Sequence, residues 1–207
     1  MARYERYRAL SQRKDPTEPN RGDTPAEGLD HENHNCQPTG AAAGLEHHTH
    51  GKVKKRGGDL RHLLPKPDTG SLPGVELNLH DMKVAWAKLG FKLIIAGEEA
   101  LAKNRITGWK GIKQRRAEGR FLLVIGDSGE LDGACSEGQD TGHLIAVHPD
   151  DPPAIHSGDW LTMDPWCYRA GTKGLGKWRW LDRDDVWDFS RRLDFEFAYT
   201  RPLTKLA

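Results

Sequence analysis

The chain has 207 residues, with 31 Lys and Arg against 30 Asp and Glu and with 36% hydrophobic residues. This length suits one domain with some extra chain, and the balanced charge excludes a protein that is drawn as a whole to nucleic acid or to anionic lipid. No stretch resembles a signal peptide or a membrane-spanning helix. The three cysteines, Cys36, Cys135 and Cys167, are too far apart for a secreted disulfide scaffold, so we expect synthesis in a reducing compartment.

Residues 1–32 are rich in Arg, Asp, Glu, Pro and Gly and contain almost nothing apolar. This composition is typical of an arm that packs on another surface or stays disordered. We therefore expect two parts, a polar N-terminal arm over 1–32 and one folded domain over 33–207.

The first half of the domain predicts helices. At Cys36 the sequence changes to small residues, with Asn35 as N-cap and Pro38 in the first turn of a helix. A second helix begins after Asn78, where apolar residues recur every three or four positions. A short basic helix is expected over 108–119. We assign four of its basic residues to a solvated face: Lys110, Lys113, Arg115 and Arg116.

Segments typical of strands dominate the second half. Phe91 to Gly97 predicts one buried strand, and a helix is expected from Asp182 to Arg192. Four more strands are expected within 120–126, 142–149, 159–166 and 195–203. Helices followed by a run of strands indicate an α+β domain with a mostly antiparallel sheet.

Three motifs suggest other chemistry, but their context does not fit. "GDSG" (126–129) resembles hydrolase nucleophile signatures, but His143 follows the serine closely. A chymotrypsin-like chain needs its histidine well before the serine, and an SGNH enzyme needs it far downstream. "GTKGLGK" (171–177) resembles a phosphate-binding loop, but Trp178 stands where Ser or Thr is needed. The histidines within 31–50 lack the spacing of zinc ligands, so we expect neither a metal nor a cofactor.

Thiolate chemistry requires a stabilised thiol, a base and a group that orients the base. The candidates for these three roles are, in this order, Cys36, His143 and Asp164. The N-terminus of a helix stabilises a thiolate and offers N–H groups for an oxyanion hole. His143 follows Gly142 at the start of an apolar strand, and His148 at the far end of that strand is its rival. Asp164 ends the next strand, which the intervening loop allows to pair antiparallel.

These pieces, in this order, resemble the papain-like cysteine peptidases and specifically their C39-like branch: Cys36 in "NCQPTGAAAGL", His143 in "GHLIAV" and Asp164 in "WLTMDPW". The resemblance runs from Cys36 to about Leu203. It implies an α+β fold in which the nucleophile helix packs on a mostly antiparallel sheet, with an extended arm in front. It also implies a triad in which Cys36 attacks a carbonyl, His143 transfers the proton and Asp164 fixes the imidazole.

Two positions depart from the family pattern. The family usually places a glutamine before the nucleophile as an oxyanion donor; here Asn33 is the best substitute, beside the backbone N–H of Cys36. Gln37 stands where glycine is common in the C39 branch, which leaves open whether the thiol has peptidase geometry. A bridge between Cys36 and Cys167 would silence the nucleophile.

The chain also resembles small papain-like proteins of tailed bacteriophages, on "CQPTGAAAGL" and on "WRWLDRDDVWDF…FAYTRPL". This resemblance implies a protein of the virion or the host cytoplasm that acts on a peptide or a cell-wall peptide. The alternative is a virion, tail or assembly component that keeps the peptidase fold with weak or no activity and binds other virion proteins through residues 1–32. Nucleic-acid binding ranks last, and no membrane partner is expected.

Overall fold

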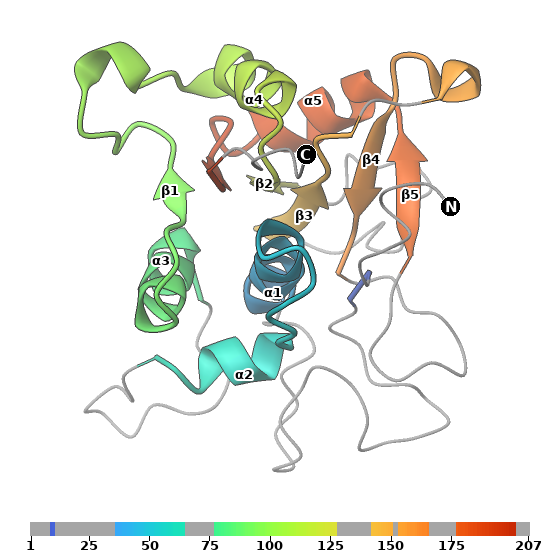
Figure 1. The fold of residues 1–207 in the computed structure, drawn as a ribbon. Helices are drawn as coiled ribbons and strands as arrows, with labels where there is room; N and C mark the ends of the chain where they lie inside the picture. Colours follow the sequence, from blue (N-terminus) through green and yellow to red (C-terminus); the bar gives the residue numbers. More distant parts are fainter. Residues whose placement is uncertain are drawn as a thin grey trace.

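The computed structural model describes residues 9–10, 36–64, 77–127, 142–150, 153–165 and 177–201. Its centre is a six-stranded sheet in the order β1-β6-β2-β3-β4-β5, in which every neighbouring pair is antiparallel (Figure 1). The strands are β1 (Ile94–Ile95), β2 (Leu122–Gly126), β3 (His143–Val147), β4 (Trp160–Met163), β5 (Trp178–Leu181) and β6 (Phe197–Tyr199). The helices are α1 (Cys36–His48), α2 (Gly57–Arg61), α3 (Leu79–Lys88), α4 (Gly108–Ala117) and α5 (Arg183–Arg191), with 3-10 turns η3 (Ala102–Asn104) and η5 (Ala154–His156).

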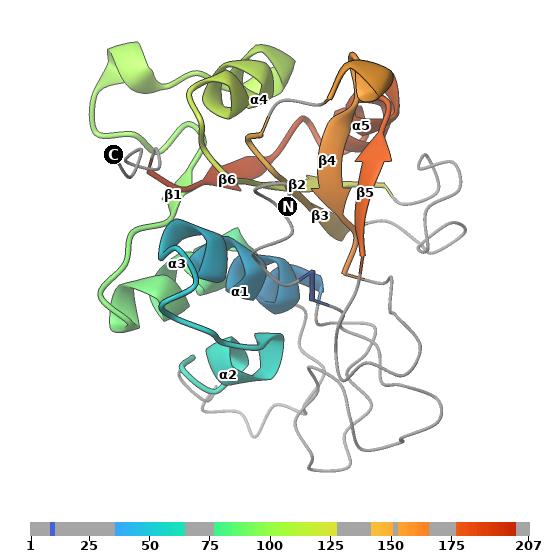
Figure 2. The same cartoon turned by 45° about the vertical axis from the view of Figure 1, so that its right-hand side comes forward.

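Helices cover both faces of the sheet. Successive residues of β2 and β3 alternate between two apolar clusters, as strand geometry requires. Leu123 and Leu144 belong to the cluster that α1, α2 and α3 complete, whereas Leu122 and Ile145 belong to the cluster with α4 and α5. Figure 2 shows the two helical layers on opposite sides of the central strands. No described helix is long and apolar enough to cross a membrane.

Helix α1 is buried along nearly its whole length, because small residues let it lie close to the sheet. A Cβ on Gly40 would lie 2.2 Å from Leu144 Cδ2 of β3, and a Cβ on Gly44 would lie 3.2 Å from the Phe121 ring. The run of alanines between these glycines supplies helix propensity without bulk. The sequence therefore places α1 directly against β3.

Helix α3 begins as predicted at Asn78. The Asn78 side chain accepts hydrogen bonds from the backbone N–H groups of His80 (2.9 Å) and Asp81 (3.1 Å). The Asp81 carboxylate accepts in return from the Asn78 N–H at 2.9 Å, which completes a capping box. The helix ends before Gly90, whose φ of 82° favours glycine.

The assignment of the α4 basic residues to a solvated face was wrong for two of the four. Arg115 is only 5% exposed, and Arg116 is 8% exposed. The Arg115 guanidinium lies over the Tyr199 ring and pairs with Glu118 at 3.1 Å. That of Arg116 lies 5.2 Å from the centre of the Trp160 ring. A planar guanidinium can stack on an aromatic ring while its N–H groups find acceptors, so both cations are buried with partners.

The sheet differs from expectation at its two edges. β5 was not predicted, yet it pairs with all of β4, from Trp160 opposite Leu181 to Met163 opposite Trp178. β1 is shorter than the expected strand over 91–97. The four other predicted strands and the helix before β6 are present.

Two residues of the N-terminal arm are described, and both are buried in this chain's own core: Ala9 and Leu10. The Leu10 N–H donates a hydrogen bond to Met163 Sδ at 3.0 Å, at the end of β4. These two residues therefore pack on their own domain, where the composition predicted an arm that packs on another surface or stays disordered.

Candidate active site

The start of α1, the start of β3 and the end of β4 lie close together. Cys36 is the first residue of α1 and His143 is the first residue of β3, while Asp164 directly follows β4. Because β3 and β4 pair antiparallel, with Ala146 opposite Met163, the end of β4 returns to the start of β3. The structure therefore brings together the cysteine, the histidine and the aspartate that the sequence singled out.

His143 connects the other two side chains. Its Nε2 lies 2.7 Å from Asp164 Oδ1, and both side chains are buried. Burial disfavours the charged imidazolium, but hydrogen bonds to Asp164 and to Cys36 and the charges of both partners outweigh burial and raise the pKa of His143 to about 10. Since Nε2 faces the carboxylate, Nδ1 is the nitrogen left for the thiol. The arrangement therefore favours a protonated imidazole ring held between Asp164 and Cys36.

Cys36 is a free thiol that is 7% exposed, and Cys167 lies outside the described residues. It begins a helix whose first N–H groups point toward any negative charge at this position. Arg61 of α2 lies near enough to act electrostatically on both Cys36 and Asp81. Burial lowers the pKa of Arg61, and these two partners oppose that change. A half-buried cation thus lies close enough to the Cys36 side chain, at the helix N-terminus, to interact with it.

His148, the rival base, lies at the opposite end of β3 and away from the thiol. Its Nδ1 accepts a hydrogen bond from the Asp150 N–H at 3.1 Å. Its ring packs edge-on against the ring of His47, with centroids 4.4 Å apart. Burial lowers the pKa of His148 to about 3 and that of His47 to about 2, with smaller contributions from neighbouring cations. Of the two candidate bases, the structure brings only His143 to Cys36.

The sequence did not reveal this pair of buried histidines. His47 stands in "EHHTHG", which is typical of solvated residues, and only its place at the end of an otherwise small and buried helix distinguishes it. Asn33, Cys135 and the "GTKGLGK" motif up to Gly176 lie outside the described residues. In the described part of the chain, no three His, Cys, Asp or Glu side chains cluster as metal ligands.

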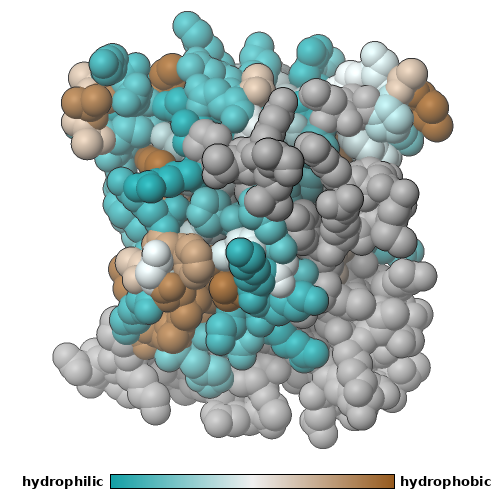
Figure 3. Space-filling view, viewed as in Figure 1, coloured by the Kyte–Doolittle hydropathy of each residue, from teal (hydrophilic) through white to brown (hydrophobic). Residues whose placement is uncertain are grey.

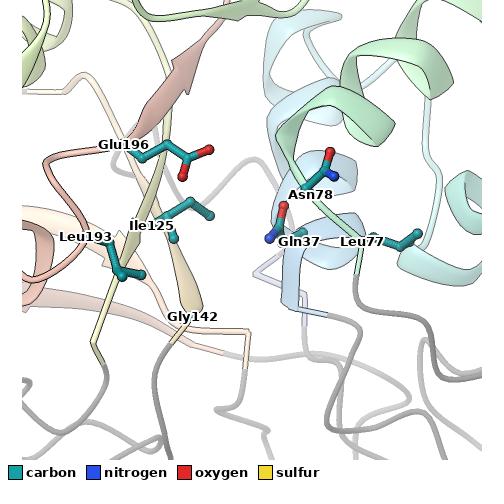
Figure 4. A pocket seen from close by; sticks show the side chains of 7 residues that line it. All are labelled: Gln37, Leu77, Asn78, Ile125, Gly142, Leu193 and Glu196. Atoms are coloured by element: carbon teal, nitrogen blue, oxygen red, sulfur yellow. The ribbon is translucent and has the colours of Figure 1, made fainter.

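A pocket of about 440 Å³ lies beside the cysteine and the histidine. Gln37, the residue after Cys36, lines it, as does Gly142, the residue before His143. The other lining residues come from distant segments, which is why sequence patterns did not identify them: Leu77, Asn78, Ile125, Leu193 and Glu196. Figure 4 shows the Glu196 carboxylate on the sheet side of the pocket, pointing toward the side where Gln37 and Asn78 lie.

The fold of this chain is similar to that of solved structures. One, described as a C39-like peptidase from Bacillus anthracis, superposes with a TM-score of 0.51 at 11% identity, over 95% of this chain and 99% of that chain. The chain has a C39-like peptidase fold. A second structure is the peptidase domain of Streptococcus ComA, a bifunctional ABC transporter involved in a quorum-sensing pathway; it gives a TM-score of 0.44 at 12% identity, over 84% of this chain and 96% of that chain. No family model and no curated protein matches the sequence.

The similarity to the Bacillus anthracis structure concerns the fold. It confirms the predicted α+β architecture, in which an N-terminal helix packs on an antiparallel sheet.

Proposed function

We propose that the chain is a cysteine hydrolase that cleaves a peptide or amide bond, with Cys36 as nucleophile, His143 as general acid and base, and Asp164 as the residue that orients His143. The observation that carries the proposal is the hydrogen-bonded series from Asp164 through His143 to Cys36 at a helix N-terminus. The fold shared with C39-like peptidase structures supports it.

The reaction follows from this geometry. The Cys36 thiolate attacks the carbonyl carbon, and a C–S bond forms as the carbonyl oxygen becomes an oxyanion. The backbone N–H of Cys36, together with Asn33 in this proposal, stabilises that oxyanion. When the tetrahedral intermediate collapses, the C–N bond breaks and His143 gives its proton to the departing amine. Water then attacks the thioester while His143 accepts its proton, the C–S bond breaks, and the carboxylic acid leaves the restored Cys36 thiolate beside protonated His143.

The experiment that tests the proposal combines substrate turnover with thiol labelling. We expect the wild-type chain to cleave members of a mixed peptide library and to react with iodoacetamide at Cys36, and we expect Cys36→Ala to lose both. His143→Ala should lose turnover and slow the labelling of Cys36. The chain offers a matched control in His156, whose Nδ1 lies 3.1 Å from Asp159 Oδ2 outside the site, so His156→Ala should change neither readout.

A second candidate function is a binding or assembly role in a phage particle, in which the fold is kept and the chemistry is weak or absent. The phage assignment rests on the sequence resemblance. The structural observation that favours an interface is an apolar patch in the region of α3, where Val84 is 43% exposed and Phe91 is only partly buried (Figure 3). This candidate would be favoured over the hydrolase if iodoacetamide labels Cys36 at the rate of an ordinary thiol and if His143→Ala leaves that rate unchanged.

A further inference from the structure

Two polar side chains lie on opposite sides of the pocket beside Cys36 and His143. Glu196 contributes a carboxylate from the residue before β6, and Gln37 contributes its side-chain amide from the first turn of α1. Gln37 is only 6% exposed, and its Oε1 has no hydrogen-bond partner among the described residues. The Gln37 amide is neutral, so the Glu196 carboxylate is the charged group of this pair.

The remaining polar group in the lining does not change this balance. Asn78 uses its Oδ1 to cap α3, where it accepts from two backbone N–H groups. Among the described residues, the Glu196 carboxylate takes part in no recorded ion pair or hydrogen bond, and no Lys or Arg lines the pocket. The described lining therefore presents a negative charge to the occupant of the pocket.

Aliphatic side chains form the rest of the walls. Ile125 and Leu193 stand on the sheet side with Glu196, and Leu77 stands on the helical side (Figure 4). A group that suits such walls and a carboxylate has an apolar stem and a cationic, donor-rich head. Lysine and arginine side chains have this form.

The backbone holds Glu196 in place at the pocket wall. Its carbonyl oxygen accepts from the Ile125 N–H at 3.0 Å, and its own N–H donates to the Leu193 carbonyl at 3.1 Å. The two preceding residues, Asp194 and Phe195, have φ angles of 51° and 56°, a backbone region that residues other than glycine rarely adopt. The turn that carries Glu196 is therefore constrained at both ends.

We propose that this pocket is a substrate subsite that takes a lysine or arginine side chain next to the scissile bond, and that Glu196 determines this specificity. The inference rests on the proposed hydrolase function, because the pocket is a subsite only if Cys36 attacks a peptide. A substrate with an acidic side chain at the same position is disfavoured by the like charge of Glu196.

The first test does not require turnover. Cys36 is modified with two methanethiosulfonate reagents, one bearing a trimethylammonium group and one bearing a sulfonate, and each rate is divided by that of free cysteine. We expect the cationic reagent to be favoured and Glu196→Gln to reduce the preference by about fivefold to tenfold, as a charge pair at a partly screened site would. Glu196→Lys should reverse it. The matched control is Asp184→Asn, which removes one carboxylate from the exposed start of α5 and should leave the ratio unchanged.

The second test measures cleavage of peptide libraries with lysine, arginine, leucine or glutamate at each position near the scissile bond. We expect the wild type to favour a basic residue at one position and Glu196→Gln to lose that preference while still cleaving neutral peptides. Cleavage with no basic preference in either protein would overturn the subsite and leave the hydrolase standing. A Glu196-dependent reagent ratio in a chain that cleaves no peptide would keep the charged pocket and overturn the proposed function, and an unchanged ratio in Glu196→Gln would overturn the inference.

Discussion

Lowering the pH from 6.0 to 5.0 is expected to reduce the free energy of unfolding through the buried pair His47 and His148. The pKa of His47 is lowered from 6.5 to about 2, and that of His148 to about 3, mainly because burial disfavours their charged forms. Both stay neutral in the folded chain within this range, whereas the unfolded chain takes up protons at its ordinary pKa of about 6.5. The unfolded state thus binds more protons, and stability falls as the pH falls.

The magnitude follows from proton linkage. Each histidine contributes about 1.2 kcal/mol of destabilisation between pH 6.0 and 5.0, so the two together contribute about 2.4 kcal/mol. Burial also lowers the pKa of His48, which adds to the loss with the same sign. Glu99 and Glu118 have lowered pKa values and lose their stabilising contributions mainly below the ordinary carboxylate range. They therefore contribute little to the change in stability between pH 6.0 and 5.0.

His143 acts in the opposite direction and at higher pH. Its pKa is raised to about 10, so it is protonated in both states below pH 6.5 and its contribution is constant there. That contribution is lost as the pH rises from 6.5 toward 10. The two effects together predict that the free energy of unfolding is greatest near neutral or slightly acidic pH.

Urea-induced unfolding followed by tryptophan fluorescence at pH 6.0 and 5.0 measures this change. His148→Gln keeps a polar group at the position, and it should remove about 1.2 kcal/mol of the pH-dependent loss. His80→Gln, on the exposed side of α3, is the control and should behave like the wild type. A wild-type loss below about 1 kcal/mol, or an equal loss in His148→Gln, would refute the reasoning.

Three further predictions concern the site and the fold. Asp164→Asn should lower the pKa of His143 and slow iodoacetamide labelling of the thiol at neutral pH by about tenfold or more. Gly126→Ala should destabilise the chain by roughly 1–3 kcal/mol in urea unfolding, because its Cβ would lie 2.2 Å from the Phe189 carbonyl oxygen. Asn78→Ala should cost about 1 kcal/mol, because α3 loses its N-cap.

Each of these three has a matched comparison. Asp159→Asn alters a half-buried His–Asp pair outside the site, and equal slowing of labelling by both substitutions would contradict the role of Asp164. Gly44→Ala introduces a contact of 3.2 Å with a ring and gains helix propensity, so a cost as large as that of Gly126→Ala would contradict the packing argument. Asn78→Asp keeps an acceptor at the cap, and it should retain most of the stability that Asn78→Ala loses.

Much of the architecture was visible in the sequence because the central elements are apolar runs with clear ends. Cys36, His143 and Asp164 each stand at such an end, so the order of the runs was enough to place them on a helix and two adjacent strands. β5 was missed because its four residues follow a glycine-rich segment and include an arginine between two tryptophans.

What the sequence could not reveal depends on contacts between distant residues. The burial of Arg115 requires Tyr199 beneath its guanidinium, and that partner lies on the last strand. The same holds for His47 with His148, and for Glu196, which meets Gln37 across a pocket formed only when α1 lies against the sheet. No local pattern carries such information, because each residue taken alone is typical of a solvated surface.

Helix α1 and strand β3 touch at both ends, with Cys36 beside His143 and His47 beside His148. His47 lies eleven positions after Cys36 in α1, a rise of roughly 16 Å, and His148 lies five positions after His143, roughly the same distance along β3 and its end. An added residue in the middle of α1 would turn one end relative to the other by about 100°. The helix would then keep either the contact between Cys36 and His143 or the contact between His47 and His148, but not both. The length of α1 therefore links the reactivity of the thiol to the stability of the fold.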